Sequence, residues 1–314
     1  MNTYCGAILA AGSGRRMGVL SEHYPKPLLP IANDPIIVHH LRYMRELGIQ
    51  KVYIVVGHGA TQIVRFLGDG SRYNVEITYV EQGKPLGSAH AVGRLASHIM
   101  GPFLLILGDY YISAPQISRM LERAETTRSS VMAAKVERNM KALCEACELE
   151  LNPDGMVVNI IEKPKVPKGN LKGCGVYVFF PVFFDAVRRT PRTALRDEYE
   201  ISIAVELYIK SGMELYAEEV IEWDMNFTCP EDILKCNLLW LEHNDKQELI
   251  GSNVRLAEGT QLTKSIIGNN VVLKKPAALT EVVVFPDVHV DGGAHIQRTL
   301  ITPHGLLPCP QEII

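Results

Sequence analysis

A glycine-rich turn followed by basic residues is the first feature of the chain that could do chemistry. An apolar segment runs into the sequence LAAGSGRRM at residues 9–17, and PKPL follows at residues 25–28. Glycines after a strand let backbone N–H groups approach phosphate oxygens, and Arg16 and Lys26 add positive charge. A P-loop needs Lys and Ser or Thr after its second glycine, and a dinucleotide fingerprint needs glycine where Met17 stands, so neither motif is present. The turn predicts phosphate binding, with a basic surface loop as the alternative.

Strands and helices that alternate up to about residue 136 must position this turn. Short apolar runs predict strands at 4–9, 52–56, 75–80 and 103–107. The clearest helix between them begins with Asp34 as N-cap and Pro35 at its first position, and it ends at Gly48. Such repeats predict a mostly parallel sheet, in which ligands bind beyond the carboxyl ends of the strands. The loops after Leu9, Val80 and Leu107 are therefore the expected places for a site.

The middle of the chain, from about 137 to 228, extends this pattern. Apolar runs predict strands at 157–161, 175–180 and 214–217, and helices are expected at 202–210 and 230–244. This section is expected to belong to the same domain and to carry a second half of the site.

The chain repeats from residue 250 onward. Apolar residues recur every six positions in three trios, each starting seventeen residues after the last: Ile250, Leu256, Leu262; Ile267, Leu273, Leu279; Val284, Val290, Ile296. This period predicts a three-sided β-helix, with an irregular β-sandwich as the alternative. Ile301 is expected to begin a fourth coil. Because so short a stack exposes strand edges at its ends, the repeat also favours a homo-oligomer.

The ordered set of motifs resembles the sugar-1-phosphate nucleotidylyltransferases, the group of glucose-1-phosphate thymidylyltransferase and the sugar pyrophosphorylases. After the glycine turn and PKPL come EQ at 81–82, LGSA at 86–89, LGD at 107–109, EKP at 162–164, and WD at 223–224 with PED at 230–232. The resemblance extends from residue 4 to about 238, and the repeats match the left-handed β-helix that many members carry. It implies an α/β fold: a mostly parallel, Rossmann-like nucleotidyltransferase domain at 1–244 and a short left-handed β-helix at 245–314.

Each matching position takes a role from this resemblance. Arg16 would bind the β and γ phosphates of a nucleoside triphosphate, and Lys26 would neutralise the charge that develops on phosphate oxygens. Asp109 and Asp224 would hold Mg²⁺, because hard carboxylate oxygens suit that ion. The other expected site residues are Ala10, Gly12, Gln82 and Gly87 around the nucleotide base, and Glu162, Lys163 and Gly175 around the sugar 1-phosphate.

The implied reaction is a direct displacement. The sugar 1-phosphate oxygen would attack the α-phosphorus, and pyrophosphate would leave in line, so that catalysis needs positioning and charge stabilisation without a covalent intermediate. Taken singly, Asp109 could merely cap a turn, and Asp224 could be an ordinary loop carboxylate. A non-catalytic paralogue that binds a nucleotide sugar is the main alternative. Retention of the arginine, both lysines and both carboxylates favours the enzyme. An acyltransferase role for the β-helix is weaker, because three coils leave little lateral surface.

Five positions and an insertion depart from the family pattern. Ala146 and Cys147 stand where members often have Tyr-Gly, and Gly173 stands where an Asn is frequent. Tyr110 and the residue after it are bulkier than usual, and two extra residues separate Asp224 from the PED motif. These changes bear on the choice of sugar and on the second metal ligand more than on the reaction.

Composition and charge exclude several classes of function. The 314 residues are 47% hydrophobic and 21% charged, which is typical of a globular protein with a large core. A net charge of −3 provides no global attraction for nucleic acid or an anionic membrane. The seven scattered cysteines predict free thiols in a reducing compartment, and the apolar start lacks the order of a signal peptide. The sequence therefore predicts a cytoplasmic enzyme whose partners are its small-molecule substrates and copies of itself.

Overall fold

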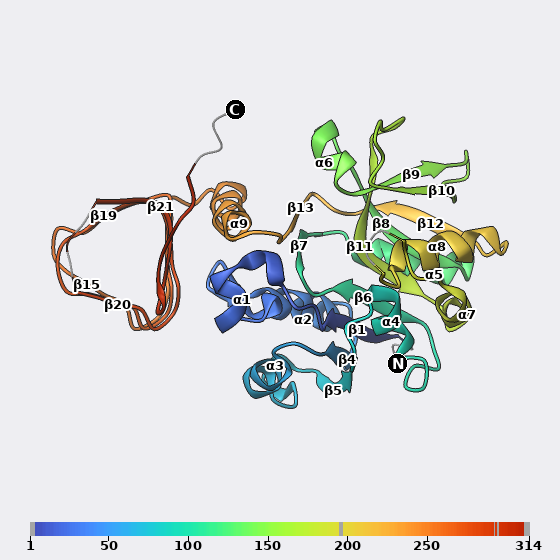
Figure 1. Ribbon diagram of the computed structural model, residues 1–314, viewed down its shortest axis with the longest axis horizontal. Coiled ribbons are helices and arrows are strands. Elements are labelled where there is room, and N and C mark those ends of the chain that lie inside the picture. The colour runs from blue at the N-terminus through green and yellow to red at the C-terminus, as the bar shows by residue number, and fades with distance from the viewer. Residues whose placement is uncertain (1–3, 195–196, 292, 294, 311–314) are drawn as a thin grey trace. The chain divides into compact units, whose positions relative to one another are not determined.

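Contacts divide the protein into two compact units, each of which is described by itself. The computed structural model (Figure 1) describes residues 4–194, 197–291, 293 and 295–310. The first unit comprises Met1–Ser13 and Ile37–Asp224, and the second comprises Gly14–Ile36 and Met225–Ile314. The predicted division at residue 244 follows chain order instead. The two divisions differ because α9 (Pro230–His243) contacts strands of the second unit, β2 (Pro30–Ile31) and the β-helix strands β19 (Ala278–Val284) and β21 (His295–Thr302).

A mixed sheet is the framework of the first unit. In the described residues it has nine strands, in the order β10-β9-β11-β6-β1-β4-β5, with β8 paired to β11 and β12 paired to β8. The strands are β1 (Cys5–Ala10), β4 (Lys51–Val56), β5 (Glu76–Glu81), β6 (Phe103–Leu107), β8 (Ser130–Val136), β9 (Cys147–Leu151), β10 (Val157–Glu162), β11 (Leu171–Phe179) and β12 (Leu215–Glu219). Strands β6, β1, β4 and β5 run parallel, whereas β11 is antiparallel to both β6 and β8. The predicted mostly parallel, Rossmann-like fold is confirmed, and its strands lie within a residue or a few of the expected positions.

Helices cover both faces of this sheet. The helices of the first unit are α2 (Ile36–Glu46), α3 (Ala60–Leu67), α4 (Ser88–Gly93), α5 (Ser118–Thr127), α6 (Met140–Cys144), α7 (Phe183–Arg189) and α8 (Ile201–Lys210). Gly6 faces α2 so closely that an added Cβ would lie 2.4 Å from the Met44 sulfur. The next residue, Ala7, faces the opposite side, where it joins a core that includes residues of α4, α7 and α8.

Aromatic rings fill the centre of that core. Phe179 of β11 and Phe183 of α7 stack with ring centroids 3.6 Å apart, and both are fully buried. Burying an aromatic side chain of this size stabilises a fold by roughly 1.5–3 kcal/mol. The packing fixes the helical layer against the sheet and so fixes the ends of the strands, where the loops gather.

The predicted N-cap at Asp34 is wrong. Asp34 and Pro35 form the short strand β3 (Asp34–Pro35), which pairs with β2, and the helix begins at Ile36. Ala32 and Asn33 join the two strands with φ angles of 50° and 69°. Two successive positive φ values are the signature of a tight type I′ hairpin turn, and this turn takes the chain through the place where the sequence predicted a cap.

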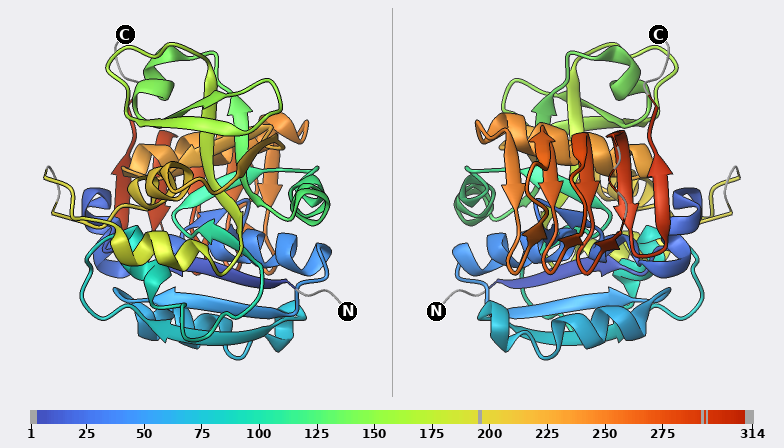
Figure 2. Two further views of the ribbon diagram at one scale, coloured as in Figure 1. Left: turned by 90° about the vertical axis from the view of Figure 1, so that its right-hand side faces the viewer. Right: turned by 90° about the vertical axis from the view of Figure 1, so that its left-hand side faces the viewer.

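The second unit contains the predicted β-helix, whose strands lie side by side in Figure 2. Its strands are β14 (Glu248–Ile250), β15 (Arg255–Leu256), β16 (Gln261–Thr263), β17 (Ser265–Ile267), β18 (Val272–Leu273), β19, β20 (His289–Val290), β21 and β22 (Gly305–Pro308). Parallel ladders join Ile250 to Ile267, Leu256 to Leu273 and Leu262 to Leu279, which are the predicted steps of one coil.

The two ends of the β-helix differ from its middle. Ile267, Leu273 and Leu279 of the middle coil are at most 4% exposed, whereas Ile250 in the first coil is 44% exposed, because that coil has a neighbouring coil on one side only. Ile301 takes the expected first position of a fourth coil, because it pairs in parallel with Val284, but the coil goes no further. After β21 the chain reverses, and β22 runs antiparallel along β21, with Ile301 paired to Leu306.

None of the helices in the described part of the chain has the length and apolar content that a membrane span requires.

Candidate active site

The carboxyl ends of the parallel strands bring several predicted site residues together in the first unit. The Gly108 N–H donates to the Leu9 carbonyl at 2.9 Å, so the loop that carries Asp109 lies directly on the end of β1. An added Cβ at Gly108 would lie 2.5 Å from the same carbonyl oxygen, which explains why this position is glycine. Asp109 and the Ala10–Gly12 turn therefore share one edge of the sheet.

The loop after β5 is held by a buried amide. Gln82 is 6% exposed, and its Nε2 donates to the Gly87 carbonyl at 2.9 Å. Gly87 adopts a φ of 109°, and a Cβ there would lie 2.5 Å from the Tyr199 carbonyl oxygen. Only glycine fits this backbone and this close approach. Of the residues predicted to surround the base, Gln82 and Gly87 thus form one rigid loop.

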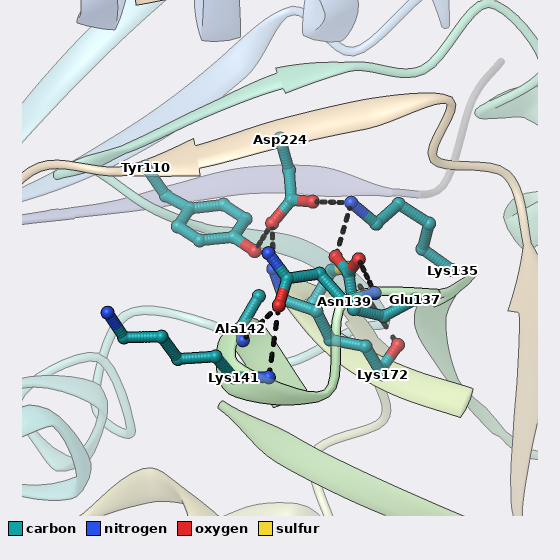
Figure 3. A network of polar contacts seen from close by, with 9 residues as sticks. Tyr110, Lys135, Glu137, Asn139, Lys141, Ala142, Lys172 and Asp224 are labelled. Atoms are coloured by element: carbon teal, nitrogen blue, oxygen red, sulfur yellow. Dashed lines mark hydrogen bonds and ion pairs between the residues drawn. The ribbon is translucent and has the colours of Figure 1, made fainter. Parts of the chain in front are cut away.

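Asp224 lies at the centre of a buried polar network (Figure 3). Its side chain has no exposed surface, and its carboxylate contacts the ammonium groups of Lys135 at 2.6 Å and Lys172 at 2.5 Å. The Tyr110 hydroxyl donates to the same carboxylate. Lys135 also pairs with Glu137 at 3.0 Å. Two cations therefore face two carboxylates, and the charges of the network balance.

Separate parts of the sequence supply this network. Lys135 is on β8 and Lys172 on β11, while Tyr110 begins β7 (Tyr110–Ser113) directly after Asp109. Asp224 lies on β13 (Trp223–Asn226), which pairs with β7. The Glu222 N–H donates to the Ser113 carbonyl at 2.9 Å just before β13 begins. This pairing places Asp224 beside the segment that follows Asp109.

Burial and charge act in opposite directions on the network. Burial raises the pKa of the Asp224 carboxyl above its ordinary value, and burial lowers the pKa of the Lys172 ammonium. The ion pairs favour the charged form of each partner. Because the nitrogen–oxygen distances are 2.5–2.6 Å, the geometry favours the charged forms of Asp224, Lys135 and Lys172.

His40 supports the same segment from beneath. Its ring is fully buried, and Nε2 donates to the Tyr110 carbonyl at 2.8 Å. Burial lowers the pKa of His40 to about 3, so the imidazole is neutral at physiological pH. The side chain is structural, and it helps to fix the backbone next to Asp109.

Two of the predicted sugar-phosphate residues, Glu162 and Lys163, lie at the end of β10, beside the start of β9. Lys163 is exposed and has a φ of 50°, and its N–H donates to the Ala146 carbonyl at 2.8 Å. A left-handed, non-glycine residue before proline is strained, and such strain persists where surrounding contacts require it. Glu162 pairs with Cys147 across the two strands. The thiol that departs from the family pattern thus lies beside the residue expected to contact the sugar.

Gly175 allows β11 to approach β6 closely. A Cβ there would lie 2.8 Å from the Leu107 side chain, two residues before Asp109. Its observed role is close packing of the two strands.

Arg16 and Lys26 belong to the second unit. Arg16 is exposed on a short 3₁₀ turn, η1 (Arg15–Met17). Lys26 is 7% exposed, and its Nζ donates to the Phe227 carbonyl at 2.6 Å. Gly14, with a φ of 63°, lies so close that an added Cβ would be 3.2 Å from the Lys26 side chain. The glycine turn and Lys26 therefore come together, as expected of parts of one phosphate-binding segment.

The acidic residues fit a magnesium ion unequally. In the described parts of the chain, no group of three or more His, Cys, Asp or Glu side chains is arranged to hold a metal ion. Mg²⁺ needs only one or two carboxylates when water and substrate phosphates complete its shell. Asp109, partly exposed after β6, fits this requirement. Asp224 fits it only if its carboxylate exchanges an ammonium group for the cation, because its side chain is closed to solvent.

Sequence reasoning missed Tyr110, Lys135 and Lys172 as parts of the site. The sequence marked Tyr110 only as bulkier than the residue usual in the family. A usable signal was present: Lys135 follows five consecutive buried residues of β8, and a lysine that ends such a run needs a counter-charge. Its partner, however, is 89 residues away (224 − 135), so the sequence alone could not identify it.

A Rossmann-like sheet whose glycine turn and carboxylate loops meet at the strand ends defines a phosphate-handling enzyme. The chain belongs to the nucleotidyl transferase family, whose model matches residues 5–226. A second model, the GlmU-like C-terminal hexapeptide, matches residues 243–313 and identifies the left-handed type of β-helix.

Known proteins resemble the chain over most of its length. It is 34% identical over 240 residues to the low-salt glycan biosynthesis nucleotidyltransferase Agl11 of Haloferax volcanii, covering 76% of this chain and 66% of that protein. It is 32% identical over 225 residues to the UTP–glucose-1-phosphate uridylyltransferase AglF of the same organism, covering 72% of this chain and 91% of that protein. A solved structure of a putative glucose-1-phosphate thymidylyltransferase from Bacillus anthracis is similar with a TM-score of 0.67 at 25% identity, covering 75% of this chain and 94% of that one.

Proposed function

We propose that the chain transfers a nucleoside monophosphate from a nucleoside triphosphate to a sugar 1-phosphate and releases pyrophosphate. The observation that carries the proposal is the meeting of the glycine turn and the Asp109 loop at one sheet edge, through the hydrogen bond from Gly108 to Leu9. Relatives named for this chemistry support it.

Each residue then has a part in a displacement at the α-phosphorus. The loop of Gln82 and Gly87 would border the base, and the backbone of Ala10 and Gly12 would approach the nucleotide. Arg16 and Lys26 would stabilise the triphosphate and the departing pyrophosphate, since both supply fixed positive charge.

The acceptor side needs a cation for the incoming phosphate. Lys163 would bind the sugar 1-phosphate, and its backbone, which has a positive φ, would hold the side chain in position. Glu162 would contact a sugar hydroxyl. Gly175 keeps β11 close to the Asp109 loop. Because the attacking phosphate is already ionised at neutral pH, no general base is required.

Asp109 and Asp224 would hold Mg²⁺. When bound, this ion neutralises phosphate oxygens and stabilises the charge of the transition state. The two carboxylates come from the loop after β6 and from β13, which the pairing of β7 with β13 links.

We further propose a cytoplasmic homo-oligomer. All seven cysteines are free thiols, which suits a reducing compartment. The exposed first coil of the β-helix, with Ile250 at 44% exposure, is a surface that a second copy could cover.

A matrix of nucleoside triphosphates (dTTP, UTP, GTP) against hexose 1-phosphates tests the function, with pyrophosphate release as the readout. At least one pair is expected to give Mg²⁺-dependent release that EDTA abolishes and added Mg²⁺ restores. The pairing of Asp224 with two lysines favours the second candidate, a non-catalytic nucleotide-sugar-binding paralogue. Saturable binding of a nucleotide sugar without release for any pair would establish that candidate instead.

A further inference from the structure

The two carboxylates proposed to hold the metal have very different surroundings. Asp109 is partly exposed at a strand end, whereas Asp224 has no exposed surface and is already neutralised by Lys135 and Lys172. A divalent cation cannot approach Asp224 without facing two ammonium groups, and like charges at such distances repel strongly in a buried site. One of the ammonium groups must therefore give way.

The geometry distinguishes the two lysines. Lys135 bridges two carboxylates, Asp224 at 2.6 Å and Glu137 at 3.0 Å, so it keeps a partner if Asp224 turns to a metal. Lys172 has Asp224 as its one ion partner within 4 Å in the described residues. It also lies 5.8 Å from the centre of the Tyr110 ring, a weaker cation–π contact. Of the two lysines, Lys172 therefore has fewer ion pairs to keep it in place.

Glu137 is anchored in turn. It accepts a hydrogen bond from the Asn139 N–H at 2.9 Å, and the Asn139 side chain caps α6 through the N–H groups of Lys141 and Ala142 (Figure 3). This capped helix fixes Glu137, which fixes Lys135. Hydrogen bonds and an ion pair thus connect α6 to Lys135 through Glu137, whereas among the described residues the Lys172 ammonium has its one ion pair with Asp224.

We propose that Lys172 is a built-in placeholder for the metal: it holds the Asp224 carboxylate ionised and in position, and a divalent cation displaces it only when substrate phosphate arrives to receive the released ammonium. The inference rests on the proposed function, in which Asp224 is a metal ligand. Lys172 is 12% exposed, so its charge needs a new anionic partner once Asp224 is lost. Phosphates of the nucleotide or the sugar phosphate supply that partner. Lys172 is thus a positioning residue that makes metal entry depend on substrate.

Direct measurement of Mn²⁺ binding tests the proposal without relying on turnover. The full-length protein is titrated with Mn²⁺ alone, and free Mn²⁺ is followed by electron paramagnetic resonance. Lys172→Met is expected to lower the Mn²⁺ dissociation constant about 10-fold or more, because it removes a competing charge from the carboxylate. Adding the non-hydrolysable α,β-methylene analogues of UTP and dTTP is expected to tighten Mn²⁺ binding in the natural protein and to have less effect in the variant.

Three variants separate charge from other causes. Lys172→Gln keeps a hydrogen-bond donor and removes the charge, so it should tighten Mn²⁺ binding even if Lys172→Met weakens the fold. Lys172→Arg keeps the charge and should bind Mn²⁺ as weakly as the natural protein. Lys168→Met removes a lysine that is 77% exposed in the same unit and should change nothing.

A final pair of measurements distinguishes failure of the inference from failure of the proposed function. In Lys172→Gln, adding Asp224→Asn should abolish the tightening, since the metal would lose its ligand. Unchanged Mn²⁺ affinity in both Lys172→Met and Lys172→Gln would overturn the placeholder role, whatever the matrix of substrates shows. Absence of pyrophosphate release for every substrate pair would overturn the function instead, whatever the Mn²⁺ titrations show.

Discussion

The α/β sheet of the first unit and the β-helix of the second achieve a buried core in opposite ways. Each strand of the sheet has its own neighbours, and each loop at the strand ends has its own residues, from the Gly108–Asp109 turn to the Gln82–Gly87 loop. The β-helix repeats one coil, so that Ile250, Ile267, Val284 and Ile301 occupy equivalent positions. Chemistry needs different side chains to converge at one place, and a strict repeat cannot supply that. We therefore expect the chemistry at the strand-end loops of the first unit and a mainly structural role for the repeat.

The largest expected effect is on activity alone. Asp109→Asn should lower turnover on the order of 10³-fold, because metal-ion stabilisation of the transition state amounts to several kcal/mol. The urea midpoint of unfolding should stay unchanged, since Asp109 is partly exposed and removing its charge leaves the core intact. Asp154→Asn, an exposed aspartate in the β9–β10 turn, is the matched control and should keep full activity. Full activity of a folded Asp109→Asn protein would remove this residue from the site.

A substitution inside the β-helix should lower stability and leave turnover unchanged. Leu279→Ala deletes a side chain that is 1% exposed inside the β-helix and should lower the free energy of unfolding of the second unit by about 2–5 kcal/mol. Turnover per folded molecule should be unchanged. Tryptophan fluorescence during urea unfolding follows the change, because Trp240 lies on α9 in the same unit.

The same substitution at the end of the stack provides the control for Leu279→Ala. Ile250→Ala, at 44% exposure, should cost only about 0.5 kcal/mol. Equal losses at residues 250 and 279 would show that the first coil is covered in solution, and would support the proposed oligomer.

A smaller effect than that of Leu279→Ala is expected at a corner of the coil. Asn253, Asn270 and Asp287 recur at one corner with φ angles of 55°, 60° and 62°, and their side chains form a ladder in which Asn270 donates to Asp287 at 2.8 Å. Asn270→Ala should cost about 1–2 kcal/mol, because alanine is strained in the left-handed conformation. Asn270→Gly removes the same hydrogen bonds without the strain and should cost less. Equal losses for the two variants would mean that the lost ladder, and not the left-handed backbone, accounts for the cost.

Periodic features of the fold were predictable from the sequence. The interior residues Ile267, Leu273 and Leu279 could be named because each coil repeats the same environment, and the buried strands of the sheet could be named from their apolar runs. The sequence was less informative where a helix begins and where the repeat ends. Asp34-Pro35 suits a helix start as well as it suits a hairpin strand, and the reversal after Ile301 depends on a local turn that competes with a further coil.

The parts of the candidate site that lie in short sequence motifs could be predicted. Asp109 and the glycine turn could be placed at strand ends because parallel strands present their carboxyl ends at one edge. Lys135 and Lys172 could not be assigned, because their meeting with Asp224 depends on the register of β8, β11 and β13. A buried ion pair between distant strands leaves no spacing pattern for the sequence to show.

The constant ladder offset of the β-helix makes its length adjustable. Every parallel ladder in the described β-helix pairs a residue with the one a full coil later, as Val272 pairs with His289. Duplicating residues 268–284 would add one complete coil, and each side chain would keep its inward or outward direction. An insertion shorter than a full coil would turn apolar side chains toward water. The β-helix could thus gain whole coils, in evolution or by design, with no change to the loops that surround Asp109.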